Sequence, residues 1–208
     1  NLAIAFAQAG QRVALVDADL RKPTLHKLFG LPQRVGLTTV LLDQTGVHDA
    51  IQQLSPDLPA VLASGQLPPN PSELLGSHRM EELLAELRAA YEVVLVDCAP
   101  LLPVTDPMVV SRFADGILLI ARAGTTTRDQ AQAANIACSK AGAKVFGAVL
   151  NATPVTEGDQ PAYYAYYGEA GRQRVDGGLD LAAGNGAGPH PFGATRASRY
   201  RRVRSGDR

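Results

Sequence analysis

Two aspartates that follow an apolar run are the residues of this chain best suited to chemistry. In the segment VALVDADLRKP, Asp17 and Asp19 come directly after aliphatic residues, and the basic pair Arg21 and Lys22 follows. Such a run predicts a buried parallel strand, and in an open α/β sheet the carboxyl end of that strand faces the ligand crevice. Two carboxylates there are costly to leave unpaired, so the pattern predicts a metal ion or cations nearby. The alternative is that the aspartates only cap a helix that begins near Arg21.

A second apolar run ends in the same way. The segment YEVVLVDCAP predicts a strand from Val93 to Asp97. A carboxylate after an aliphatic strand is typical of a Walker B site, where it holds Mg²⁺ directly or through water. The motif alone is weak, but together with Asp17 and Asp19 it becomes moderately specific.

The rest of the chain predicts an α/β protein built on a parallel, right-handed sheet. Further strands are expected at 60–63, 116–121 and 145–150, and helices at 2–9, 77–90, 106–113 and 128–141. Gly10 is expected to end the first helix, and Ser77 to cap the second. A length of 208 residues, 46% of them hydrophobic, suits one such domain with a real core.

Composition narrows the function only weakly. The formal net charge is zero, so nothing overall demands nucleic acid or a membrane. Two cysteines are too few for a disulfide scaffold or a zinc site, which favours a reducing cytoplasm. His26 and His48 have no partners at metal-binding spacing and are interpreted as structural. The sequence shows no bilayer-spanning stretch and no signal peptide.

The C-terminal part changes in character after Asn151. It is rich in Pro, Gly and polar residues, which predicts a disordered tail. Within it, PAYYAYYGE brings together four tyrosines, namely Tyr163, Tyr164, Tyr166 and Tyr167. A sticky strand or an interface anchor is the alternative to a modification site, because tyrosine is favoured at interfaces. Residues 196–208 are arginine-rich, as many solvated basic tails are.

Three separated segments together resemble the bacterial tyrosine kinases of capsule and exopolysaccharide synthesis. They are QRVALVDADLRKPTLHKLFGLP, ASGQLPPNPSELLGSHRMEELLAELRAAYEVVLVDCAP and PVTDPMVVSRFADGILLIARAGTTTRD. The resemblance covers about residues 1–151, and its three motifs are more specific together than any one alone. It implies a P-loop NTPase-like three-layer fold related to the partition and septum-site ATPases. The stretch 65–75 matches a characteristic loop and helix start whose physical role the sequence does not explain.

The resemblance also assigns roles to residues. The Walker A′ motif falls on Asp17 and Asp19, and the Walker B aspartate on Asp97. Phosphoryl transfer needs a metal and a group that orients or deprotonates the nucleophile. Asp19 and Asp97 are the candidates for holding Mg²⁺, largely through water, and Asp17 for accepting the tyrosine proton. The order of roles within the Asp17 and Asp19 pair is open to reversal.

The remaining expectations concern the nucleotide, the substrate and the partners. Asn151 matches a position that contacts the base of the nucleotide, here ATP, with turn initiation as the alternative. Arg128 is a candidate subunit contact, although a solvated first-turn residue is the more common case. The tyrosine cluster is expected to be the autophosphorylation substrate, presented to a neighbouring subunit of a homo-oligomer. The expected domains are a kinase-like 1–153 and a tail 154–208.

A membrane activator or chain-length regulator domain, fused or separate, is the other expected partner, and nucleic acid is not expected. Such a membrane domain would place the protein in the cytoplasm at the inner face of the membrane. In the family the usual Thr-Pro-Pro follows the Walker B aspartate, whereas this chain has Cys98, Ala99 and Pro100. Losing the hydroxyl removes one hydrogen bond near the metal, with a simple buried cysteine the preferred interpretation of Cys98.

No GxxxxGK[ST] loop occurs in the sequence. We therefore expect a fragment cut just after the Walker A motif, which would bind ATP·Mg²⁺ poorly on its own. A partition-type or septum-type switch ATPase and a non-catalytic fragment are the alternatives. The first would need a basic DNA-binding face or an amphipathic membrane helix, and the tail shows neither in clear form.

Overall fold

The computed structural model describes residues 1–154; the tyrosine cluster and the arginine-rich segment lie outside the described residues. Within it the helices are α1 (Leu2–Gln8), α2 (Leu25–Leu28), α3 (Leu37–Leu41), α4 (Val47–Ala50), α5 (Pro71–Leu75), α6 (His78–Ala90), α7 (Asp106–Ser111) and α8 (Arg128–Lys140). The strands are β1 (Val13–Asp17), β2 (Gln52–Gln53), β3 (Ala60–Leu62), β4 (Val93–Asp97), β5 (Ile117–Arg122) and β6 (Val145–Asn151). Residues 1–119 with 126–149 form one compact unit, and 120–125 with 150–154 belong to another. The predicted boundary at 153/154 stays a prediction.

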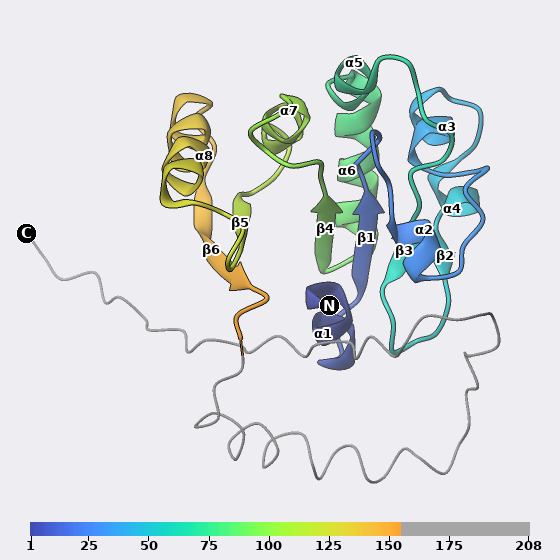
Figure 1. The fold of residues 1–208 in the computed structure, drawn as a ribbon. Helices are drawn as coiled ribbons and strands as arrows, with labels where there is room; N and C mark the ends of the chain where they lie inside the picture. Colours follow the sequence, from blue (N-terminus) through green and yellow to red (C-terminus); the bar gives the residue numbers. More distant parts are fainter. Residues whose placement is uncertain (155–208) are drawn as a thin grey trace, which may run out of the picture. The chain divides into compact units, whose positions relative to one another are not determined.

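The first unit is organised around a four-stranded sheet in the order β2-β3-β1-β4 (Figure 1). β1 pairs in parallel with β3 on one side and with β4 on the other, while β2 adds an antiparallel edge. The parallel α/β fold predicted from the sequence is confirmed. The strands β5 and β6 pair with each other in a separate two-stranded sheet.

The core lies against β1, all five residues of which are buried. One hydrophobic cluster joins β1 and β3 to the helices α3, α4, α5, α6 and α7. On α6 the buried residues are Met80, Leu83, Leu84 and Leu87. This i, i+3, i+4, i+7 spacing places one apolar face of the helix on the core. The sheet edge that carries the aspartates therefore rests on a rigid base.

Helix and strand ends differ from the predicted ones by only a few residues. α6 begins at His78 because the Ser77 hydroxyl accepts a hydrogen bond from the Met80 N–H, which confirms the predicted cap. Gly10 follows α1 with φ +87°, a conformation that favours glycine. The sequence did not predict α2, α3, α4 and β2, and it indicated α5 only as a helix start within 65–75. Each has five residues or fewer, which is too short for periodicity to reveal.

Two glycines allow the loop after β3 to pack closely against the start of α3. Gly65 has φ +77°, and a Cβ built on it would lie 2.3 Å from the Thr38 Oγ1. A Cβ on Gly36 would lie 2.1 Å from the Ala63 carbonyl oxygen. Two backbone hydrogen bonds tie these segments together, from the Leu37 N–H to Ala63 and from the Thr38 N–H to Ser64. The loop therefore leads to α5 along a fixed path.

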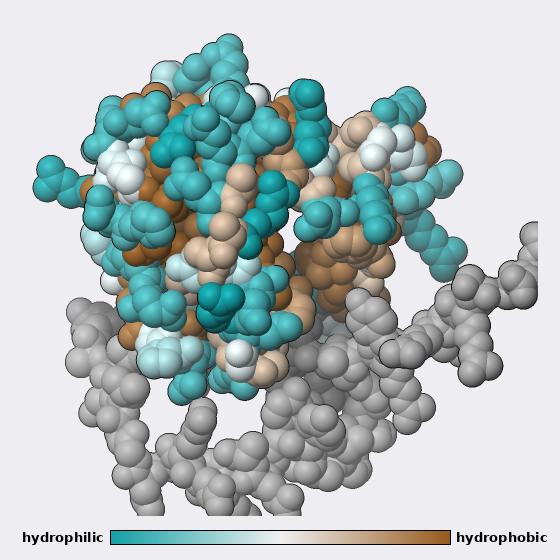
Figure 2. Space-filling model, turned by 180° about the vertical axis from the view of Figure 1, so that it is seen from behind, coloured by the Kyte–Doolittle hydropathy of each residue, from teal (hydrophilic) through white to brown (hydrophobic). Residues whose placement is uncertain are grey.

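The surface of the described part is mixed. Figure 2 shows hydrophilic side chains over much of the visible face, with hydrophobic side chains between them. Large exposed apolar side chains occur on both strands of the two-stranded sheet, Leu118 and Ile120 on β5 and Phe146 and Leu150 on β6. Among the described residues, no helix is long and apolar enough to cross a membrane.

Candidate active site

Three aspartates predicted from the sequence come together at the carboxyl ends of two neighbouring strands. β1 and β4 run in parallel register, so that Asp17 lies directly beside Asp97. The Ala18 N–H donates to the Asp97 carbonyl oxygen at 2.8 Å and continues this pairing past the end of β1. Asp19 follows two residues after Asp17, and its charge acts on both other carboxylates. The register of β1 and β4 therefore brings the three candidate residues to the same end of the sheet, and their roles stay predictions.

Asp17 is completely buried, and only half of its carboxylate has a partner. Its Oδ2 accepts a hydrogen bond from the Leu25 N–H at 3.1 Å, at the start of α2. Its Oδ1 has no hydrogen-bond partner among the described residues. Burial raises the pKa of Asp17 to about 6, the Leu25 N–H lowers it, and the charge of Asp97 raises it further. An unpartnered buried oxygen of this kind suits a site that a polar ligand or a cation completes.

Asp19 is half-buried and organises the turn that follows β1. Its Oδ1 accepts hydrogen bonds from the N–H groups of Arg21 at 3.1 Å and Lys22 at 3.0 Å. The capping alternative is therefore correct in part, since both aspartates accept backbone N–H groups after the strand. The next helix begins at Leu25, however, and not near Arg21. Capping accounts for one oxygen of each carboxylate.

Asp97 is the exposed member of the group. Burial of part of its carboxylate raises the pKa of Asp97, and the negative charge of Asp19 adds to the effect. In the described part of the chain, no three His, Cys, Asp or Glu side chains are close enough to hold a metal ion by themselves. This arrangement fits Mg²⁺, which binds through one or two carboxylates and keeps several waters or phosphate oxygens as ligands.

A buried carboxylate, Asp106, forms a polar network with Arg21 and Ser72 that the sequence did not predict. Asp106, at the start of α7, has a side chain that is 0% exposed. Arg21 donates to it through Nε at 2.7 Å and through Nη2 at 3.1 Å, and the Ser72 hydroxyl also donates to it. These bonds lower the pKa of Asp106, with the Arg21 contact the largest cause. Nothing in the sequence pairs residues 85 positions apart, so Asp106 was expected only to begin a helix.

Cys98 follows Asp97 and is half-buried. Its Sγ lies 3.9 Å from the Val96 carbonyl oxygen, so the thiol contacts the backbone of its own strand. Burial raises the pKa of Cys98 to about 12, and the neighbouring carboxylates, Asp97 first, raise it as well. The thiol is therefore neutral near pH 7, which agrees with the interpretation as a simple buried cysteine.

The remaining predicted site residues are Arg128, Asn151 and the four tyrosines. Arg128 is exposed at the first position of α8, directly after the Thr127 cap. Asn151 belongs to the second compact unit, where its Oδ1 accepts the Ala152 N–H at 2.8 Å. That bond and the positive φ of Ala152 are those of the turn that was its alternative role. Tyr163, Tyr164, Tyr166 and Tyr167 lie outside the described residues.

Comparison with known proteins adds an independent line of argument. A family model described as an AAA domain matches residues 1–124. Tyrosine-protein kinase YwqD of Bacillus subtilis is 43% identical over 168 residues, which cover 81% of this chain and 70% of that protein. Putative tyrosine-protein kinase CapB of Staphylococcus aureus is 37% identical over 169 residues, covering 81% and 73%. Tyrosine-protein kinase etk of Escherichia coli K12 is 38% identical over 73% of this chain, but the match covers 21% of etk.

Solved structures agree with these relatives. The chimerical protein CapA2B2 superposes with a TM-score of 0.72 at 37% identity, covering 74% of this chain and 69% of that one. The cell division ATPase MinD of Pyrococcus furiosus superposes with a TM-score of 0.62 at 25% identity, covering 75% and 65%. The kinase likeness is the stronger of the two in both identity and superposition. Together with the aspartates at the carboxyl edge of the sheet, these matches show that the chain belongs to the bacterial tyrosine-protein kinases, on a P-loop NTPase-like fold.

Proposed function

We propose that the chain is the catalytic part of an ATP-dependent autokinase that phosphorylates its own C-terminal tyrosines, Tyr163, Tyr164, Tyr166 and Tyr167. In this proposal the modification regulates capsular or exopolysaccharide synthesis or export. The observation that carries it is the meeting of Asp17, Asp19 and Asp97 at one sheet edge, with one buried carboxylate oxygen left without a partner. A structural cluster would satisfy that oxygen.

Asp19 and Asp97 are the residues that would hold Mg²⁺. Asp97 is exposed, and the Oδ2 of Asp19 has no part in the bonds that its Oδ1 makes to the turn. When bound with ATP, Mg²⁺ neutralises the charge that develops on the transferring phosphoryl group. The chain's own contribution is to fix two carboxylates at neighbouring strand ends.

Asp17 is proposed to accept the proton of the tyrosine hydroxyl. Its pKa of about 6 leaves it ionised near pH 7 and makes it a stronger base than an ordinary carboxylate. Because its side chain is fully covered, a hydroxyl reaches Oδ1 only when the covering residues move. Asp19 is half-buried and is therefore the alternative base, with the two roles reversed.

A neighbouring subunit is the proposed source of the tyrosine, in a homo-oligomer that Arg128 helps to form. Its exposure at the start of α8 supports a contact role. We propose that Asn151 contacts the nucleotide base. A membrane activator or chain-length regulator domain, fused or separate, would hold the protein at the inner face of the membrane. The match covers 70% of YwqD and 73% of CapB but 21% of etk, so the proposal includes both arrangements. Nucleic acid has no role in this proposal.

The test uses the chain with a Walker A phosphate-binding loop joined before Asn1. After incubation with ATP and Mg²⁺, mass spectrometry should find phosphate on one or more of the four tyrosines. Asp97→Asn should abolish labelling, whereas replacing all four tyrosines by Phe should leave ATP binding unchanged. Mixing an Asp97→Asn subunit with an active subunit that lacks the tyrosines should label the first, which would show transfer between chains.

A switch ATPase is the second candidate, because MinD of Pyrococcus furiosus shares the fold at 25% identity. Such a protein hydrolyses ATP without transferring phosphate to tyrosine. ATP hydrolysis in the absence of phosphotyrosine would favour this candidate and refute the autokinase.

A further inference from the structure

Asp106 is buried, charged and outside the group of aspartates assigned above. Its side chain is 0% exposed, and it accepts two hydrogen bonds from Arg21 and one from Ser72. The Arg21 Nη2 also lies 3.4 Å from the Ser72 Oγ, so the three side chains form one closed network. A bidentate Arg–carboxylate pair fixes direction as well as distance. Such a network holds its parent segments in one arrangement.

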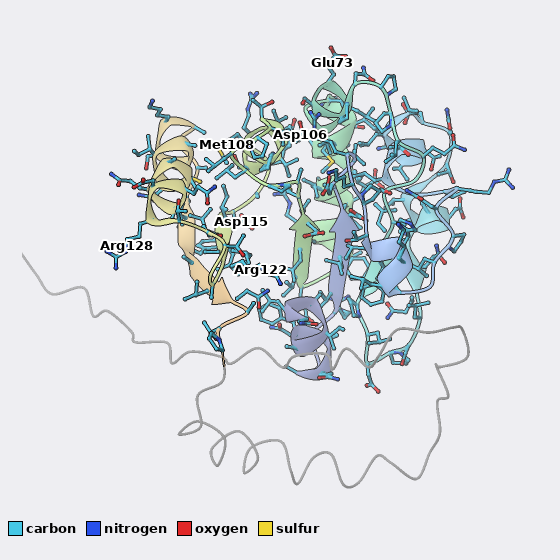
Figure 3. The ribbon with its side chains drawn as sticks, in the orientation of Figure 1. Glu73, Asp106, Met108, Asp115, Arg122 and Arg128 are labelled. Atoms are coloured by element: carbon cyan, nitrogen blue, oxygen red, sulfur yellow. The ribbon has the colours of Figure 1, made fainter. Side chains whose placement is uncertain are left out.

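The network joins three segments that leave neighbouring parallel strands. Arg21 lies on the segment that follows β1, Ser72 is in α5 after β3, and Asp106 begins α7 after β4. Figure 3 shows Asp106 on the side of α7 that faces α5, whereas Glu73 points outward from α5. The helices α5 and α7 also pack closely, since a Cβ on Gly76 would lie 2.9 Å from the Val109 Cγ1. The stretch 65–75, whose role the sequence left unexplained, thus places Ser72 in contact with Asp106.

Arg21 connects this network directly to Asp19. Its side chain is held by Asp106, and its main-chain N–H donates to the Asp19 Oδ1 at 3.1 Å. A change in the position of Arg21 therefore changes the turn that orients the Asp19 carboxylate. The same contact keeps the guanidinium occupied. Released from Asp106, a cation two residues from Asp19 would compete with a metal ion for that carboxylate.

We propose that Asp106, acting through Arg21 and supported by Ser72, is a positioning residue that holds Asp19 ready for a divalent cation. The proposal rests on the proposed function only for the identity of the reaction. It gives the three segments a common purpose, which is to fix the Asp19 carboxylate relative to Asp97. Arg21, Ser72 and Asp106 need not touch the nucleotide or the tyrosine.

The experiment measures metal affinity in two ways, in the protein that carries the phosphate-binding loop. Titration with Mn²⁺ in the presence of ADP, followed by electron paramagnetic resonance, reports binding without any reaction. The Mg²⁺ concentration for half-maximal autophosphorylation reports the same property during turnover. In Asp106→Asn and Arg21→Lys we expect metal binding to weaken by about tenfold or more, as for other residues that orient metal ligands. Both the Mn²⁺ dissociation constant and the Mg²⁺ concentration for half-maximal autophosphorylation should rise. The rate at saturating Mg²⁺ should fall less than the metal affinity.

Two matched variants serve as controls. Arg79→Lys changes an arginine that pairs with Asp43, Glu82 and Glu86. None of these carboxylates belongs to β1, to β4 or to the loops that follow them. Glu73→Gln changes the carboxylate next to Ser72. Both should bind Mn²⁺ like the unaltered protein. Circular dichroism identifies folded variants, and Arg21→Lys serves if Asp106→Asn does not fold.

Unchanged Mn²⁺ affinity in a folded Arg21→Lys or Asp106→Asn variant would overturn the positioning role. If the unaltered protein does not label its tyrosines, the autokinase proposal fails instead. The Mn²⁺ titration then still decides whether Asp106 positions Asp19.

Discussion

Asp17 and Asp106 are both completely buried, yet their surroundings are opposite. Asp106 receives a bidentate arginine and a serine hydroxyl, and these bonds lower its pKa. Asp17 accepts a hydrogen bond from the Leu25 N–H, its Oδ1 has no hydrogen-bond partner among the described residues, and burial together with the charge of Asp97 raises its pKa to about 6. The two residues differ in partners and not in exposure.

The partners of Asp106 make its charge stabilising, whereas the buried charge of Asp17 lowers the stability of the fold. Burial disfavours the charge of Asp17, and no cation of the chain compensates it among the described contacts. Buried groups with shifted pKa values gather at functional sites, although ion-pair networks such as that of Asp106 shift pKa values too. The direction of the shift is therefore more informative than its presence. A raised pKa in a carboxylate beside other carboxylates indicates a site that a bound cation would stabilise.

The largest expected effect comes from removing the compensated carboxylate. Asp106→Ala should lower the free energy of unfolding at pH 7 by about 3 kcal/mol, because Arg21 and Ser72 lose their common acceptor. The Arg21 side chain is 41% exposed and regains water, so we expect the low end of the range for buried pairs. Urea unfolding measures the change. The lowered pKa means that this contribution is present above pH 3.8 and disappears as pH falls through the native pKa.

A less buried pair supplies the control for this first prediction. Glu86→Ala removes a carboxylate that is 43% exposed and lies 3.0 Å from Arg79 on the surface of α6. Its effect should be about 0.5 kcal/mol or less. Equal losses in the two variants would mean that the buried network contributes no more than a surface ion pair.

Removing the uncompensated charge should have the opposite sign. Asp17→Asn keeps an oxygen that can accept the Leu25 N–H and removes the buried charge. We expect the free energy of unfolding above pH 6 to increase by up to about 3 kcal/mol, as the shift in pKa implies. Tyrosine phosphorylation should fall at the same time. A variant that is less stable than the parent at pH 7 would contradict the idea that Asp17 carries a cost.

The pH dependence gives this second prediction a clear signature. Native Asp17 keeps its proton up to a pH of about 6, whereas the unfolded residue releases it near 3.8. The native state binds the extra proton in this window, so its stability decreases as pH rises from 3.8 to 6. Asp17→Asn should remove that decrease, and the two proteins should converge in stability below pH 3.8. Urea midpoints across this range measure it.

The sequence predicted the strands well, but not how deeply each is buried. VALVD and VVLVD have almost the same pattern, and both form strands that end in aspartate. β1 is buried throughout because it has a parallel neighbour on each side. β4 pairs with β1 alone in the described part of the chain, and its residues are half-buried or exposed. Composition cannot distinguish these cases, since burial depends on the number of neighbouring strands.

The candidate site was predictable where its residues follow strands, and not where they meet through tertiary contacts. Asp17, Asp19 and Asp97 were identified because strand ends share one edge of a parallel sheet. Asp106 and Ser72 were not, because they contact Arg21 only after three separate segments have packed together. A single sequence gives the chemistry of a motif more readily than the network that supports it.

The smallest effect tests whether Ser72 belongs to the network or only lies beside it. Ser72→Ala removes one of the hydrogen bonds to Asp106 but leaves the two from Arg21. We expect a loss of about 1 kcal/mol in the free energy of unfolding, as for a single hydrogen bond. In Asp106→Ala the same change should have almost no further effect, because the acceptor is already absent. Urea unfolding of the two single variants and the double variant measures this coupling. Additive losses would show that Ser72 acts independently of Asp106, and would leave the Arg21 pair as the only contact that sets Asp106 apart from Asp17.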